Sequence, residues 1–177
     1  MKQPARIQPA ERSGDADASR QARAPDYAGV TSHPMHYFAA IVRQNQINLA
    51  QVLRPFELSV QQWRVLSALA AKDGHTVGQL AEFAVLDRSG LGRLLEQMEA
   101  DGLVERTSAP EDRRAVLIRL SPMGKKRRAA AFPVVVAHYR RLLQGVSGGD
   151  YKLLMGLLRR IKANALMMAD VSLLGSD

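Results

Sequence analysis

One segment, residues 101–124, constrains the fold of this chain more than any other. An apolar run closed by a Glu-Arg pair is followed by a turn too polar to bury, and then by a β-branched, aliphatic run over residues 115–120. The pattern predicts a β-hairpin that ends where a new helix starts. Its tip carries Arg113 and Arg114, and two arginines held there suit a narrow groove of high negative potential, such as the minor groove of DNA.

The positive charge of the chain is concentrated around this segment. The formal net charge is +8 at pH 7, and the sequence pI is about 10.3. Residues 103–128 alone carry eight cations and three anions. This surplus predicts a polyanionic partner, either nucleic acid or an acidic membrane surface, that docks against this part of the chain.

Several protein classes are excluded by what the sequence lacks. There is no cysteine, which excludes structural disulfides, thiolate metal sites and a cysteine-based oxidant sensor. No apolar run approaches the roughly 20 residues that span a bilayer. The N-terminus has no apolar segment of the kind found in secretory signals. We therefore expect a cytoplasmic protein that does not enter a membrane.

An enzyme is not expected either. The sequence contains no Gly-rich phosphate loop, no G-x-S-x-G and no H-E-x-x-H motif. His33 and His36 lie three residues apart, but two histidines without a cysteine or carboxylate at ligand spacing are weak evidence for a metal site. The sequence therefore predicts no catalytic residue, no metal and no cofactor.

The N-terminal part of the chain divides into a tail and a helix. Residues 1–30 mix Pro, Ala, Ser, Gly and both signs of charge without a period, which predicts a disordered tail. A basic arm that touches phosphate is the alternative interpretation of that tail. Apolar residues then recur at helical spacing over residues 34–53, and Pro55 stops this first helix.

Two capping boxes predict the starts of the next two helices. Ser59 pairs with Gln62, and Thr76 pairs with Gln79, at the spacing at which each side chain can bond to the other's backbone N–H. The second of these helices covers residues 77–83. We expect it to bury Val77, Leu80 and Phe83.

A further helix completes a helix–turn–helix that runs into the hairpin. Asp87 is in the position of its N-cap, and Gly102 lies just past its end, as a C-cap glycine does. Gly90 and Gly92 lower its helix propensity by roughly 1 kcal/mol each relative to Ala. The residues of its inner face are Leu91, Leu94, Leu95 and Met98.

The C-terminal part of the chain is predicted to be helical. Ser121 caps a long helix that reaches about residue 144, and Pro133 should kink it. A last helix starts within residues 147–150. The first and last helices are more apolar than a small domain requires, which favours a shared dimer interface over mutual packing in a monomer. The apolar face of the last helix consists of Leu154, Leu157, Leu158, Ile161, Ala165 and Met168.

Two ordered motifs and the helix before them point to a known family. The first is the helix motif of residues 87–94 with 98–99 and 102–106, and the second follows the pattern D-x-R, three residues, Ile/Leu-x-Leu-Ser/Thr-x-x-Gly. With these motifs, residues 35–169 resemble the MarR family of winged-helix regulators. The second motif stands here as Asp112, Arg114, Ile118, Leu120, Ser121 and Gly124.

The resemblance implies a mainly α fold with a small β-wing. A MarR-type domain of residues 31–177 would hold a winged helix–turn–helix lobe over about residues 58–120. Helices of about residues 34–54 and 121–170 would form a dimerisation region. A dimer would place two recognition helices about 34 Å apart, so we expect an inverted-repeat operator in double-stranded DNA.

The resemblance also assigns roles at the DNA. Arg88, Ser89 and Arg93 lie on the polar face of the recognition helix, where arginine can bind guanine, although Arg93 could instead touch only phosphate. Arg114 would enter the minor groove, with Asp112 aiming it and Arg113 beside a phosphate or in solvent. The cations at 125–128 are either a solvated face or DNA contacts. The full expected set is Thr76, Gln79, Arg88, Ser89, Gly90, Arg93, Asp112, Arg113 and Arg114.

Regulators that resemble this family respond to small aromatic acids or phenols. Such an effector, for example a hydroxylated benzoate or nicotinate, would pair with an arginine and stack on a ring. The alternative is that Trp63 and Tyr37 are ordinary core aromatics, and Phe132 and His138 are weaker candidates. The expected ligand contacts are His36, Tyr37, Arg43, Trp63 and Arg64.

Three functions remain open at the level of sequence. The first is a homodimeric repressor that an effector releases from its operator. The second is a DNA-binding regulator that activates transcription or needs no ligand. The third is a winged-helix module that acts mainly through protein contacts, but Arg88, Arg93, Arg113 and Arg114 argue against it because such a module would not keep a basic recognition face.

Overall fold

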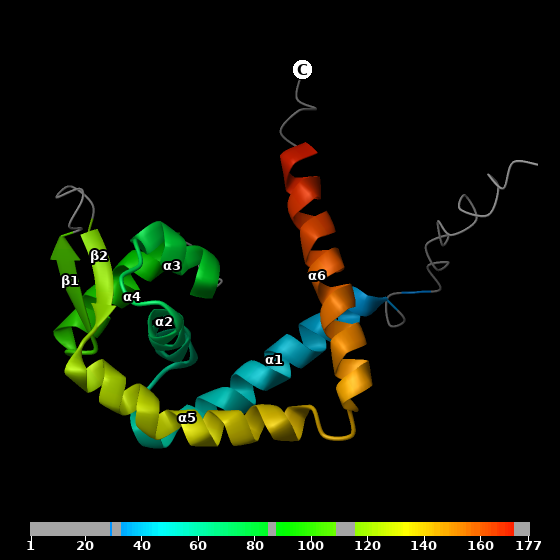
Figure 1. The fold of residues 1–177 in the computed structure, drawn as a ribbon, viewed down its shortest axis with the longest axis horizontal. Helices are drawn as coiled ribbons and strands as arrows, with labels where there is room; N and C mark the ends of the chain where they lie inside the picture. Colours follow the sequence, from blue (N-terminus) through cyan, green and yellow to red (C-terminus); the bar gives the residue numbers. More distant parts are fainter. Residues whose placement is uncertain (1–28, 30–32, 85–87, 109–115, 172–177) are drawn as a thin grey trace, which may run out of the picture. The chain divides into compact units, whose positions relative to one another are not determined.

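A computed structural model describes residues 29, 33–84, 88–108 and 116–171 (Figure 1). The fold is mainly helical with one small antiparallel sheet, which confirms the fold class predicted from the sequence. The elements are α1 (Pro34–Leu53), the 3₁₀ turn η3 (Arg54–Phe56), α2 (Val60–Ala71), α3 (Val77–Ala84), α4 (Arg88–Ala100), β1 (Val104–Ser108), β2 (Val116–Leu120), α5 (Pro122–Leu142) and α6 (Gly148–Val171).

The chain divides into two compact units within α1. The first unit ends at Arg43, and the second starts at Gln44 and contains every later element. The described part of the first unit includes the N-terminal half of α1, where Met35, Tyr37 and Ile41 are exposed. No helix among the described residues is both long enough and apolar enough to cross a membrane.

The predicted helix starts are confirmed by their caps. The Ser59 Oγ accepts a hydrogen bond from the Gln62 N–H at 3.1 Å, and the Gln62 side chain accepts one from the Ser59 N–H at 2.8 Å. Thr76 and Gln79 form the same reciprocal pair. Each box satisfies two backbone donors that the first turn of a helix leaves without partners.

The predicted hairpin is confirmed as β1 and β2. The two strands pair antiparallel, with Val104 opposite Leu120 and Arg106 opposite Ile118. β1 extends to Ser108, beyond the Glu-Arg pair at which the sequence placed its end, because the strand is half-solvated and needs no further apolar residue. The expected turn residues between the strands lie outside the described residues, as do the Asp87 cap and, apart from Gly29, the predicted tail of residues 1–30.

One hydrophobic core holds the second unit together. It collects side chains from the end of α1, from α2, α3 and α4, and from both strands. Burying one such leucine contributes about 1.5–3 kcal/mol. The largest fully buried side chains here are Leu49, Leu53, Leu66, Leu69, Leu80, Leu91, Leu95, Met98, Leu103 and Ile118.

The prediction that Phe83 is buried was wrong. Its exposed fraction is 62%, whereas Leu80 is fully buried and Val77 is half-buried. The buried stripe of α3 consists of Leu80, Ala81 and Ala84, which places Phe83 at the edge of the helix face that meets the core. An aromatic side chain on a short helix was taken for a core residue, although two alanines complete that face.

The C-terminal helices leave apolar side chains in solvent. α5 continues through Pro133 and ends at Leu142, two residues before the predicted end. On α6, residues of the predicted apolar face are exposed, among them Leu154, Leu157 and Ile161. These side chains are not part of the core.

Candidate functional site

The exposed face of α4 carries the predicted polar residues of the recognition helix. Ser89, Gly90 and Arg93 are exposed, while Leu91 and Leu95 on the opposite side are fully buried. Arg88 is the first residue of α4. A side chain built onto Gly92 would meet nothing within 4 Å, so this face of the helix is open.

The other predicted DNA contacts lie at two further places. Thr76 and Gln79 are at the start of α3, where their side chains are engaged in the capping box and the Gln79 amide nitrogen is left for another acceptor. Asp112, Arg113 and Arg114 belong to the segment between β1 and β2, which lies outside the described residues.

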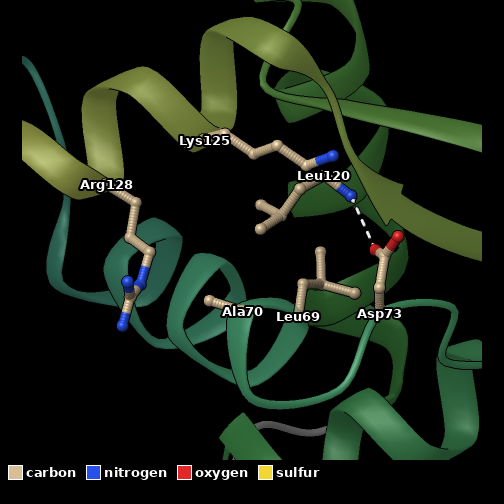
Figure 2. Close-up of a pocket in the computed structure, with 6 residues that line it drawn as sticks. All are labelled: Leu69, Ala70, Asp73, Leu120, Lys125 and Arg128. Atoms are coloured by element: carbon tan, nitrogen blue, oxygen red, sulfur yellow. Dashed lines mark hydrogen bonds between the residues drawn. The ribbon is translucent and has the colours of Figure 1, made fainter.

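Asp73 fixes the root of this hairpin to the helix–turn–helix, a contact that the sequence did not reveal. Its carboxylate accepts a hydrogen bond from the Leu120 N–H at 3.1 Å (Figure 2) and another from the Arg119 guanidinium at 3.2 Å. Arg119 in turn donates from Nε to the Thr107 hydroxyl on β1 at 3.2 Å. One carboxylate therefore joins the end of α2 to both strands.

The two residues after Asp73 add a backbone connection to β2. The His75 N–H donates to the Ile118 carbonyl at 3.2 Å, and the Ile118 N–H donates to the His75 carbonyl at 2.8 Å. Gly74 has φ +78°, and the Arg119 guanidinium lies 3.3 Å from where its Cβ would be. The Asp-Gly pair is the sequence signal for this turn.

The cation run at residues 125–128 does not form a single surface. Arg127 pairs with Glu57 at 3.1 Å, whereas the Arg128 guanidinium lies 4.6 Å from the centre of the Phe132 ring. Lys125 and Arg128 line a cavity of about 300 Å³ that also contacts Asp73 and Leu120. Figure 2 shows the Lys125 side chain reaching over Leu120 and the Arg128 side chain lying beside α2.

A second cavity, of about 370 Å³, lies between α2, α3 and α5. It brings together Trp63 and Arg64 from the predicted ligand set and Phe132 from the weaker candidates. The sequence interpretation missed the other lining residues, because they meet only in the folded chain; among them are Ser67, Phe83, Arg128 and Tyr139.

The polar groups of this α2–α5 cavity are short of partners. The Ser67 hydroxyl and the Arg128 Nε are both buried, and neither has a hydrogen-bond partner among the described residues. In that part of the chain, neither Arg64 nor Arg128 forms an ion pair with a carboxylate. Arg128 lines both cavities. An apolar cavity with unsatisfied donors and uncompensated guanidinium groups suits a flat molecule that carries an acid group.

The remaining predicted ligand residues are not among those that line this cavity. His36, Tyr37 and Arg43 belong to the first unit, where His36 and Tyr37 form an edge-to-face ring pair. His138 is hydrogen-bonded to Asn45 at 2.8 Å and lines a separate pocket with Asn48. No group of three or more metal-ligating side chains occurs in the described ranges.

The helix–turn–helix of α3 and α4, followed by the hairpin, defines a winged-helix DNA-binding protein. A MarR family model matches residues 56–115. The transcriptional regulator HosA of Escherichia coli O111:H- is 34% identical over 105 residues, which are 59% of this chain and 78% of HosA. The chain belongs to the MarR family of transcriptional regulators.

Two solved structures share the fold. A MarR-family transcriptional regulator from Silicibacter pomeroyi superposes with a TM-score of 0.69 at 29% identity, over 80% of this chain and 96% of that protein. BpsR of Bordetella bronchiseptica, whose DNA binding is regulated by 6-hydroxynicotinic acid, has a TM-score of 0.69 at 19% identity, over 76% of this chain and 96% of BpsR. These likenesses show that the fold of this chain is one found among transcriptional regulators of the MarR family.

Proposed function

We propose that the chain is a homodimeric repressor that a small aromatic acid releases from an inverted-repeat operator. The observation that carries the effector part of this proposal is the α2–α5 cavity. It combines the rings of Trp63, Phe132 and Tyr139 with the guanidinium groups of Arg64 and Arg128, which have no carboxylate partner among the described residues. A ring can stack on the aromatic residues while its carboxylate pairs with an arginine. The regulation of BpsR by 6-hydroxynicotinic acid supports this ligand class.

The DNA-binding part of the proposal rests on α4 and the hairpin. Exposed Arg93, with Arg88 and Ser89 at the helix start, would lie in the major groove. Arg114, aimed by Asp112, would enter the minor groove, and Arg113 would lie near the backbone. Thr76, Gln79 and the open face at Gly90 complete the contact set. Because the partner is genomic DNA, we infer that the protein works in the cytoplasm.

The dimer is inferred from apolar side chains that the structure leaves in solvent. Large hydrophobic residues are exposed along one face of α6, including Leu154, Leu157 and Ile161. Monomeric proteins rarely keep large contiguous apolar patches in water. A two-fold partner would cover these side chains and place the two recognition helices about one turn of DNA apart.

Mobility-shift assays with the DNA upstream of the gene that encodes this protein test the DNA contacts. We expect binding to weaken steeply between low and moderate salt, because neutralised phosphates release counterions. Arg93→Ala and Arg114→Ala should each cost about 1–3 kcal/mol of affinity per half-site. Arg140→Ala removes the same charge from the exposed C-terminal end of α5 and serves as the matched control. Equal losses of affinity in all three variants would show that Arg93 and Arg114 contribute only through their general positive charge. An affinity that does not change with salt would favour a module that works through protein contacts.

A further inference from the structure

Phe83 differs from the other side chains of the α2–α5 cavity in its origin. Among the described residues that line the cavity, all others come from α2 or α5, whereas Phe83 is on α3, the first helix of the helix–turn–helix. It is a large aromatic side chain with 62% of its surface exposed. A molecule in the cavity would therefore touch the helix–turn–helix pair of α3 and α4 through this ring.

Phe83 contacts His75, whose side chain is buried without a hydrogen bond among the described residues. The ring centres of Phe83 and His75 are 5.6 Å apart. His75 is only 4% exposed, and neither nitrogen of its ring has a hydrogen-bond partner among the described residues. Its backbone, by contrast, is bonded in both directions to Ile118 of β2. Among the described residues, no side-chain hydrogen bond of His75 therefore opposes a shift of the Phe83 ring. Such a shift reaches His75, whose backbone is joined to β2 of the wing.

The same helix is also joined to α4. Leu80 and Ala84 of α3 are buried in the core that holds Leu91 and Leu95 of α4. Packed side chains transmit displacement because interiors are dense and resist compression. A push on Phe83 therefore has two routes, one through α3 to the recognition helix and one through His75 to the wing.

We propose that Phe83 is the positioning residue that couples an occupied cavity to the loss of DNA binding. An aromatic acid held between α2 and α5 packs against the Phe83 ring in the released state and displaces it from its place in the DNA-bound state. The inference rests on the proposed effector function and adds the residue that transmits it. A ligand weakens DNA binding only through contacts that differ between the two states, and Phe83 supplies that difference.

The test compares acid binding to the free protein and to the protein saturated with operator DNA. Trp63 is the only tryptophan of the chain and lines the cavity, so its fluorescence reports occupancy directly. The probes are 6-hydroxynicotinic acid and 4-hydroxybenzoic acid. For the wild type we expect the acid to bind about 5- to 150-fold more weakly to the DNA complex, the range typical of allosteric coupling.

For Phe83→Ala we expect the acid's affinities for the free protein and for the DNA complex to differ by less than about 2-fold, which is below the typical range of allosteric coupling. Operator affinity without acid is measured for each protein as well, so that each ratio refers to that protein's own DNA complex. Phe132→Ala is the matched control, since it removes a ring from the same cavity on the α5 side. It should weaken acid binding to the free protein but keep the wild-type ratio.

Two outcomes would overturn the role of Phe83. One is a Phe83→Ala protein that binds the acid and keeps the wild-type ratio. The other is a Phe132→Ala protein that loses the ratio as completely as Phe83→Ala. If neither acid quenches the Trp63 fluorescence of the wild type, the effector part of the proposed function fails, and the coupling through Phe83 fails with it. This result differs from the two above, because in those the acid still binds.

Discussion

Gly124 is the residue at which a single added methyl group should do most damage. A Cβ at this position would overlap with the carbonyl oxygen of Leu103, where α5 crosses the start of the hairpin. Gly124→Ala should therefore destabilise the protein by about 1–3 kcal/mol, the usual cost of overpacking. At about 2–4 °C per kcal/mol for a domain of this size, thermal unfolding would show the loss.

The matched control for this change is Gly156→Ala in α6. Nothing lies within 4 Å of the Cβ that it adds, and it removes a glycine from a helix interior. We expect its unfolding temperature to stay level or rise, since alanine is favoured over glycine by up to about 1 kcal/mol in a helix. Equal unfolding temperatures for the two variants would contradict the close approach of Gly124 to the Leu103 carbonyl.

Gly92 poses the opposite question, because its surroundings are empty. Gly92→Ala should stabilise α4 by about 1 kcal/mol, as no atom lies within 4 Å of the new methyl group. If the glycines of α4 let the backbone approach DNA closely, operator affinity should fall while stability rises. Thermal unfolding and a mobility shift on the same sample separate the two effects. An affinity equal to that of the wild type would show that this face does not meet DNA.

At the scale of elements, the Asp73 carboxylate is a side-chain anchor of the wing, beside the backbone hydrogen bonds between His75 and β2. Asp73→Ala removes the acceptor for both the Leu120 N–H and Arg119, and we expect a loss of about 1–3 kcal/mol for the donor left without a partner. Asp73→Asn keeps an oxygen for the Leu120 N–H and should lose less stability. Operator affinity should also fall more for Asp73→Ala than for Asp73→Asn, because a hairpin that is less firmly attached positions its arginines less well at the DNA. Equal stability for Asp73→Ala and the wild type would refute this anchor.

Local chemistry explains which elements could be predicted from sequence. The capping boxes at Ser59 and Thr76 and the cap at Ser121 act within three residues, so their spacing alone indicated the helix starts. The hairpin followed from two apolar runs on either side of a turn too polar to bury. Trp63 and Arg64, two of the candidate ligand contacts named from the sequence, line one cavity because they are neighbours on α2.

Long-range packing explains what could not be predicted. Asp73 and Arg119 are separated by 46 residues, and nothing in either segment names its partner. Arg128 was interpreted as part of a charge run, although it turns toward the Phe132 ring and the cavity. Phe83 was expected to be buried because its residue type is apolar, whereas its exposure depends on which face of α3 meets the core.

At the scale of the whole molecule, the central prediction is a dimer formed through apolar helices. Leu157→Asp places a charge on the exposed apolar face of α6 and should yield a folded monomer with weakened operator binding. Ala163→Asp introduces the same charge on the opposite face of the helix and should remain dimeric. Sedimentation at several concentrations distinguishes the two states. A Leu157→Asp protein that sediments as a dimer would exclude this face from the interface.

Footprinting of the DNA upstream of the gene, with and without 6-hydroxynicotinic acid, tests the central claim most directly. We expect two protected half-sites in inverted orientation, with centres about 10 base pairs apart or a multiple of that distance. The acid should remove the protection at both half-sites together. A single protected site would contradict the dimeric DNA-binding mode, and protection that persists in saturating aromatic acids would contradict effector release.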